Sequence, residues 1–289
     1  MLSLLGFLGF AALAAAAPVR DQAFIPRTLV NRSIYDKLAL YAGYTQLSNT
    51  GICARPSVPG VLYQFVESKD TDTQVSIWKV DAYKEFVIAI PGTSSARDNE
   101  TNFDFALVPY QVDNVRCPSC RVHKGYQAAW RSVMKQVQGN LTNLLGIHPD
   151  YTVTLTGHSL GGGLVSIAFP NLRNGPYNVT QAYTYGQPRA GNSAFANYVD
   201  GISGASDKEA GIFYRVTHAN DLIPKLPPGI FGYKHSRTEY WESKPSMDNA
   251  ASTYRCYGQE PADCNRNATG IDSKVHVTYA GMNVTCNKS

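Results

Sequence analysis

A serine flanked by glycines is the feature that most restricts how this chain can fold. Gly157-His158-Ser159-Leu160-Gly161 fits the pattern G-x-S-x-G, with a strand-like run, Tyr151 to Thr156, before it and a helix-like segment after it. Glycine lacks a Cβ atom, so glycines on both sides relieve the steric clash of a sharp turn from strand to helix. Gly162 and Gly163 follow, and each costs a helix roughly 1 kcal/mol relative to alanine. The segment predicts a strand, a tight turn that carries the serine, and a helix with close backbone packing.

Strand-like and helix-like runs alternate along the rest of the chain. The strand-like runs are rich in β-branched and aromatic residues, and they lie at Thr73 to Val80, Phe86 to Ile90, Thr152 to Thr156, Gln181 to Tyr185 and Ile212 to Thr217. Apolar residues recur at helical spacing in Ser33 to Gly43 and in Tyr126 to Leu145. No repeat or flexible linker divides the sequence. We therefore expect an α/β fold, a single domain with a mostly parallel central sheet covered by helices on both faces.

Composition and charge exclude several other classes of protein. Of the 289 residues, 44% are apolar and 17% are charged, which excludes a disordered, collagen-like or coiled-coil chain. The formal charge of +4 is spread without a long run of Lys or Arg. We therefore expect no nucleic-acid partner, and we expect a monomer.

The N-terminal segment indicates export. Leu2 to Ala17 is an uncharged apolar stretch that ends in small residues directly before Pro18, which is typical of a signal peptide. A membrane anchor is the alternative, but a membrane-spanning helix needs about 20 apolar residues, and this stretch is shorter. We expect a signal peptide at about residues 1–17, a short pro-segment or arm at 18–30, and a secreted, extracellular domain at 31–289 without stable membrane insertion. Sequons for N-glycosylation fit this interpretation and lie at Asn31, Asn99, Asn140, Asn178, Asn267, Asn283 and Asn287.

The six cysteines of a secreted chain predict disulfides before they predict a metal site. Cys117 and Cys120 are spaced for a local bridge, and the chain has no second pair at zinc-finger spacing. Six cysteines allow fifteen pairings, so any pairing is a hypothesis. The one that we expect is Cys53–Cys286, Cys117–Cys120 and Cys256–Cys264.

A serine nucleophile needs a base and an orienting carboxylate, because its hydroxyl is a weak nucleophile on its own. In enzymes with the α/β-hydrolase fold these follow the serine in the order Asp or Glu, then His. Asp221 comes shortly after the strand-like run that ends at Thr217. His235 and His276 both follow it, His235 in a polar loop and His276 in an alternating apolar run. We expect the catalytic residues to be Ser159, Asp221 and His276, with His235 as the alternative base.

Acyl transfer also needs two donors for the developing oxyanion. The amide of Leu160, directly after the serine, is one candidate. The loop after Phe86 to Ile90 supplies the other, because Thr93 there offers its amide and its hydroxyl.

Five motifs along the chain belong together: Pro91-Gly92-Thr93, Cys117 to Tyr126 (CPSCRVHKGY), Thr156 to Gly162 (TGHSLGG), Tyr185 to Asn192 (YGQPRAGN) and Arg215 to Pro228 (RVTHANDLIPKLPP). With these motifs, the chain from about Ile34 to Cys286 resembles the fungal class 3 lipases. Within that group, Glu239 to Trp241, the Cys256 to Cys264 turn and His276 to Met282 are most similar to feruloyl esterases of the A type.

The resemblance implies an α/β-hydrolase that works through an acyl-enzyme without metal or cofactor. It places the triad on Ser159, Asp221 and His276 and the oxyanion hole on Thr93 and Leu160, and its disulfide pattern agrees with the pairing above. The chain departs from the family at the position before Gly92, where Pro91 replaces an arginine.

The segment Ser94 to Asn102 corresponds to the family's lid and is polar, so it offers little to bury in lipid. We therefore expect feruloyl-type or short-chain esters, such as plant cell-wall hydroxycinnamate esters, as substrates. Hydrolysis of tri-, di- or monoacylglycerols with the same triad is the alternative, and a non-catalytic binding protein is a remote one. Candidate residues of the pocket wall are Phe103, Phe105, Leu107 and Tyr126, of which Tyr126 matches a tyrosine of the feruloyl esterase pocket while Phe105 replaces a second.

Overall fold

The computed structural model describes residues 24–46, 58–93, 95–245, 250–270, 272 and 274–284, with the side chain of residue 96 left out. The expected signal peptide at residues 1–17, the Cys53–Cys286 pair and the sequon at Asn287 lie outside these ranges.

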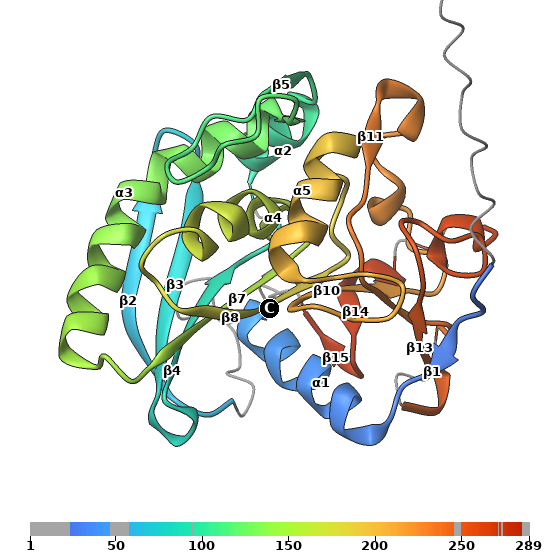
Figure 1. Ribbon diagram of the computed structural model, residues 1–289, viewed down its shortest axis with the longest axis horizontal. Helices are drawn as coiled ribbons and strands as arrows, with labels where there is room; N and C mark the ends of the chain where they lie inside the picture. The colour runs from blue at the N-terminus through green and yellow to red at the C-terminus, as the bar shows by residue number, and fades with distance from the viewer. Residues whose placement is uncertain are drawn as a thin grey trace, which may run out of the picture.

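A large central sheet is covered by helices on both faces (Figure 1). Its strand order is β1-β13-β12-β10-β8-β7-β4-β3-β2. Strands β12, β10, β8, β7 and β4 run parallel, and antiparallel pairs flank them on both sides. The expected mostly parallel sheet is confirmed. The strands are β1 (Thr28–Leu29), β2 (Val61–Ser68), β3 (Thr73–Val80), β4 (Glu85–Ile90), β7 (Thr152–His158), β8 (Val179–Tyr185), β10 (Phe213–His218), β12 (Glu239–Glu242) and β13 (Thr253–Cys256).

Two apolar clusters cover the two faces of this sheet. Along β4, Phe86 and Ile88 belong to the cluster under α3 and α4, whereas Val87 and Ala89 belong to the cluster under α1. This alternation follows from the two-residue period of a strand. The helices are α1 (Arg32–Gln46), α3 (Lys124–Ile147), α4 (Leu160–Arg173) and α5 (Ser193–Ser203), and α1 lies opposite the other three (Figure 1).

Helix α2 (Ala96–Phe103) covers the segment expected to be the lid. A capping box starts it: the Ser95 hydroxyl accepts from the amide of Asp98, and the Asp98 carboxylate accepts from the amide of Ser95. Such a cap satisfies amides that have no partner inside the helix. Close by, a small sheet is formed by β5 (Leu107–Pro109), β6 (Arg121–His123), β9 (Gly191–Asn192) and β11 (Tyr233–Lys234).

The C-terminal segment differs from its expected alternating, strand-like form. Val275–Val277 is a short 3₁₀ helix, followed by the hairpin of β14 (Thr278–Tyr279) and β15 (Met282–Asn283). His276 therefore lies in a tight turn.

The described cysteines form two disulfides, Cys117–Cys120 and Cys256–Cys264. Within the described residues, no helix is both long and apolar enough to cross a membrane.

Candidate active site

Ser159 lies in the turn between β7 and α4 with a positive φ of 54° and a ψ of −122°. A non-glycine residue rarely adopts this conformation, which is the strained geometry of a nucleophile elbow. A Cβ atom on Gly161 would lie 2.1 Å from the carbonyl oxygen of Ile90, and one on Gly157 would lie 2.5 Å from that of Gly161. The glycines are required because backbone packs directly against backbone here.

Ser159, His276 and Asp221 form a continuous hydrogen-bonded chain. The Ser159 hydroxyl lies 2.8 Å from Nε2 of His276, and Nδ1 of His276 lies 2.7 Å from Oδ2 of Asp221. Since Nδ1 donates to the carboxylate, Nε2 is left to accept the serine proton. Asp221 follows β10 and Ser159 follows β7, so the carboxyl ends of two parallel strands supply both residues.

Asp221 has further partners that hold its carboxylate and its main chain in place. The Tyr279 hydroxyl donates to Oδ2 at 2.5 Å, and the amide of Ile223 donates to Oδ1 at 2.9 Å. Asn265 donates through Nδ2 to the carbonyl oxygen of Asp221 at 3.2 Å. Tyr279 and Asn265 were not identified from the sequence, where no local pattern connects them with Asp221.

His158 supports the backbone of His276. Burial lowers the pKa of His158 to about 3, with a smaller contribution from the neighbouring His276. The imidazole is therefore neutral at pH 7, and its Nε2 lies 2.8 Å from the carbonyl oxygen of His276, to which it donates. This contact fixes the main chain of the turn that carries His276.

His235, the alternative base, lies in a different environment. Its Nε2 is 2.7 Å from the carbonyl oxygen of Pro224, and the side chain is buried. Burial and the positive charges of Arg215 and Arg189 lower its pKa well below the usual value. It is His276 that the structure brings to Ser159.

The two expected oxyanion donors flank the serine. Leu160 is the first residue of α4, so its amide has no acceptor within the helix. Thr93 lines the same pocket as Ser159, and its hydroxyl accepts a 2.9 Å hydrogen bond from Nδ2 of Asn102. The Thr93 proton is thus free to point elsewhere. Tyr126 donates to the other end of the Asn102 amide at 3.4 Å.

A pocket with a volume of about 460 Å³ opens at the serine. Most of its lining is apolar, and it includes the expected Phe103, Phe105 and Tyr126, whereas the expected Leu107 does not contribute. Residues from Ile223 to Pro228 form a further wall that the sequence did not identify. The lining residues are Thr93, Asn99, Asn102, Phe103, Phe105, Tyr126, Ser159, Pro188, Ile223, Leu226, Pro227, Pro228 and His276.

Tyr126 is held rigidly at this pocket, with 2% of its surface exposed. Its ring stacks on His123 with the ring centres 3.6 Å apart. On α4, a Cβ atom at Gly163 would lie 2.7 Å from the Tyr126 ring. The third glycine after the elbow therefore makes room for this aromatic side chain.

Large apolar side chains are exposed near the pocket. Phe103, at the end of α2, is 76% exposed, and Ile230 is 89% exposed. Phe231 is also exposed, and its ring lies 5.8 Å from that of Phe105 between centres. We call Phe103, Phe105, Ile230 and Phe231 the apolar rim.

Among the described residues, no group of His, Cys, Asp and Glu side chains could hold a metal ion.

Comparison with known proteins places this chain in a family. Residues 87–231 match the family model described as Lipase (class 3). The secreted mono- and diacylglycerol lipase 1 of Fusarium solani is 29% identical over 99% of this chain and 90% of its own length. The lipase of Rhizomucor miehei is 30% identical over 83% of this chain and 68% of its own. The crystal structure of the lipase from Rhizopus microsporus var. chinensis matches 92% of this chain and 94% of its own with a TM-score of 0.73 and 28% identity. With its α/β-hydrolase fold, the chain belongs to the class 3 lipase family.

Proposed function

We propose that this protein is a secreted acylglycerol lipase in which Ser159, His276 and Asp221 form the catalytic triad. As a class 3 lipase, the chain is a carboxylic ester hydrolase. The observation that carries the proposal is the apolar pocket of about 460 Å³ into which Ser159 and His276 both project.

His276 would act first as the base and then as the acid. It takes the Ser159 proton as the hydroxyl attacks the ester carbonyl, and it returns that proton to the departing alcohol. Water, activated by the same imidazole, then releases the fatty acid from the acyl-enzyme. Asp221 keeps Nδ1 of His276 protonated and the ring in place. The amide of Leu160 and the amide and hydroxyl of Thr93 stabilise the negative charge on the carbonyl oxygen.

The chemistry of the pocket favours acylglycerols over the feruloyl-type esters expected from the sequence. The apolar lining suits an acyl chain, and the apolar rim next to it suits a lipid surface. The hydroxyl of a phenolic substrate has fewer hydrogen-bond partners here, because Phe105 carries no polar group and the Tyr126 hydroxyl is engaged with Asn102. The names of the similar proteins, mono- and diacylglycerol lipases among them, support the same alternative.

Export is part of the proposal. Residues 1–17 would be removed as a signal peptide, residues 18–30 would form a short pro-segment or arm, and residues 31–289 would form the enzyme. Two relatives with the word secreted in their names, from Fusarium solani and Penicillium cyclopium, support this. In the described part of residues 18–30, β1 pairs with β13 at the edge of the sheet.

The test compares monoolein, diolein, triolein and methyl ferulate as substrates of the purified protein. We expect kcat/KM to be higher for at least one acylglycerol than for methyl ferulate. Ser159→Ala should lower kcat by roughly 10⁶ if the triad acts as a unit. A preference for methyl ferulate would overturn the acylglycerol assignment. Normal turnover by Ser159→Ala would overturn the triad.

A further inference from the structure

The pocket wall from Ile223 to Pro228 is held by buried side chains that take no part in the triad. A short 3₁₀ helix spans Ile223–Lys225, and the residues after it, up to Pro228, form no regular element. Leu226, Pro227 and Pro228 nevertheless line the pocket. The shape of this wall therefore depends on what binds its backbone from behind.

Arg189 supplies most of that support. Its own amide donates to the carbonyl oxygen of Leu226 at 2.7 Å, and Nη1 donates to that of Pro227 at 2.9 Å and to that of Lys225. One residue thus binds three consecutive carbonyl groups of the wall. Only 8% of the Arg189 surface is exposed, so these bonds are shielded from water.

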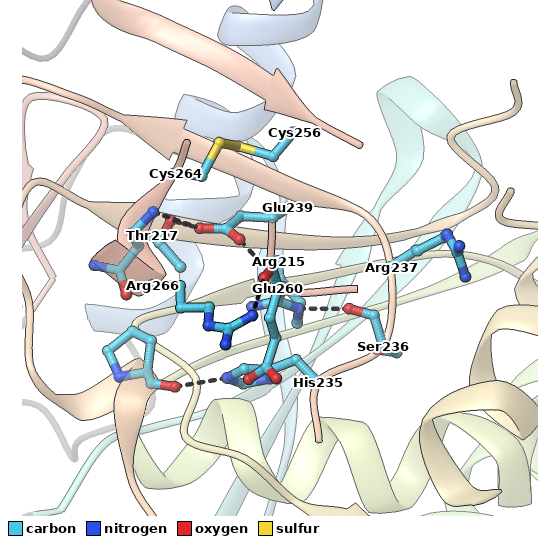
Figure 2. A network of polar contacts seen from close by, with 12 residues as sticks. Arg215, Thr217, His235, Ser236, Arg237, Glu239, Cys256, Glu260, Cys264 and Arg266 are labelled. Atoms are coloured by element: carbon cyan, nitrogen blue, oxygen red, sulfur yellow. Dashed lines mark hydrogen bonds and ion pairs between the residues drawn. A yellow bond between two sulfur atoms is a disulfide. The ribbon is translucent and has the colours of Figure 1, made fainter. Parts of the chain in front are cut away.

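Glu260 fixes the orientation of the guanidinium, because its carboxylate pairs with Nε of Arg189. Glu260 is 7% exposed and has a positive φ of 57°, a conformation that glycine adopts more easily. A glutamate at such a position indicates that its side chain matters. Figure 2 shows Glu260 next to His235 and Arg215, and Arg266 donates to the Glu260 carbonyl oxygen.

The rest of the network holds the neighbouring parts of the loop. His235 donates to the carbonyl oxygen of Pro224, and Nζ of Lys225 donates to that of Ala268 at 2.7 Å. At the other end, Asp221 is held by Asn265 and Tyr279. Asp221 and the Lys225–Pro227 backbone are therefore held by different side chains, although both belong to one short segment.

We propose that Arg189 is a positioning residue for acyl-chain selectivity, which fixes the Lys225–Pro227 backbone so that Leu226 and Pro227 form a rigid wall against the acyl chain. This inference rests on the proposed function. A long acyl chain needs the whole wall, whereas an acetyl group occupies only the space next to Ser159. Disturbing Arg189 therefore weakens the binding of long chains more than that of short ones.

Arg189→Lys tests this, because lysine keeps the charge but has one nitrogen in place of the planar fork that serves Glu260 and two carbonyl groups. The substrates are p-nitrophenyl laurate and p-nitrophenyl acetate. We expect the ratio of their kcat/KM values to fall about tenfold, within the range that pocket contacts to methylene groups give, mainly through KM for laurate. Glu260→Ala should shift the ratio in the same direction.

Arg173→Lys is the matched control. Arg173 also donates through Nη1 to a backbone carbonyl, that of Val179 at 2.6 Å, but it is exposed at the end of α4. Its ratio should equal that of the wild type. The ratio does not depend on how much of a preparation is folded, so partial unfolding of a variant does not imitate the effect.

The outcomes separate the two proposals. If Arg189→Lys leaves the laurate-to-acetate ratio of kcat/KM unchanged, because both esters lose activity equally or not at all, the positioning role is overturned while the ester hydrolase activity stands. Failure of the wild-type protein to hydrolyse either ester would overturn the proposed function and this inference with it.

Discussion

His276 and His235 follow Asp221 in the same chain yet have opposite surroundings. His276 bonds Ser159 and Asp221, whereas His235 is buried and donates to Pro224. We expect His276→Ala to lower kcat nearly as far as Ser159→Ala does, by up to about 10⁶. His235→Gln should retain most of kcat, because the glutamine amide can replace the Nε2 donor. Initial rates on p-nitrophenyl butyrate check this, and the reverse ranking would exchange the roles of the two histidines.

Asn102 gives a second prediction for single residues. Because its Nδ2 donates to Oγ1 of Thr93, the Thr93 proton is directed away from Asn102 and is available to the oxyanion. Asn102→Ala removes this orientation without removing the hydroxyl. We expect kcat to fall about tenfold, less than the 10²- to 10³-fold that loss of a whole oxyanion donor costs, with KM little changed. Steady-state kinetics on a soluble ester measure both constants, and an unaltered kcat would speak against the role.

For single residues, what could be predicted from the sequence depended on local context. Ser159 sits in a recognisable turn, and Asp221 and His276 follow it in the order that the chemistry requires. Asn102 and Tyr279 carry no such signal. Tyr279 is 58 residues from Asp221 in the chain, and only the fold brings its hydroxyl to the carboxylate.

The elements around the pocket mouth predict how the protein meets its substrate. The short 3₁₀ helix Gly229–Phe231 carries Ile230 and Phe231, two exposed members of the apolar rim. If the rim enters a lipid surface, Ile230→Ser with Phe231→Ser should lower the rate on emulsified triolein about tenfold or more, because burying one such side chain is worth about 1.5 to 3 kcal/mol. Activity on soluble p-nitrophenyl butyrate serves as the reference. Equal losses on both substrates would contradict a surface role.

The polar sequence of α2 gave an incomplete prediction of this surface. The segment Ser94 to Asn102 offers little to lipid, but Phe103 directly after it is exposed, and Ile230 and Phe231 come from another part of the chain. Periodicity within one segment does not reveal a surface that two distant segments share. The parallel strands β4, β7, β8 and β10 were easier to predict, since their buried runs are local.

At the scale of the whole molecule, buried neutral histidines link stability to pH. Burial lowers the pKa of His123 to about 4 and that of His158 to about 3, and the pKa of His235 is also lowered. When the pH falls below about 6.5, these side chains take up protons in the unfolded chain but not in the folded one. The free energy of unfolding should therefore decrease by about 1.4 kcal/mol per pH unit for each of them.

Urea unfolding at pH 7, 6 and 5 measures this decrease, and His235→Gln provides the comparison. The variant keeps a donor for Pro224 but does not titrate, so its stability should fall less steeply than that of the wild type. The difference between the two proteins should narrow as the pH falls. Parallel curves would show that His235 is not held neutral in the folded protein.

The fold class and the family were predictable at this scale, and both are confirmed. The strands on one side of the sheet were not, because β1, β12 and β13 are only two to four residues long, and β1 pairs with a partner far along the chain. The prediction of a single domain relied on the absence of linkers and repeats, and such an absence can be seen directly in a sequence.

Tyr126, packed between His123 and Gly163, also bears on directed evolution of this protein. Substitution of Gly163 would displace the Tyr126 ring, since a Cβ atom there would lie 2.7 Å from it. Libraries that aim at bulkier substrates have more freedom at Leu226 and Phe105, whose side chains are partly open to solvent.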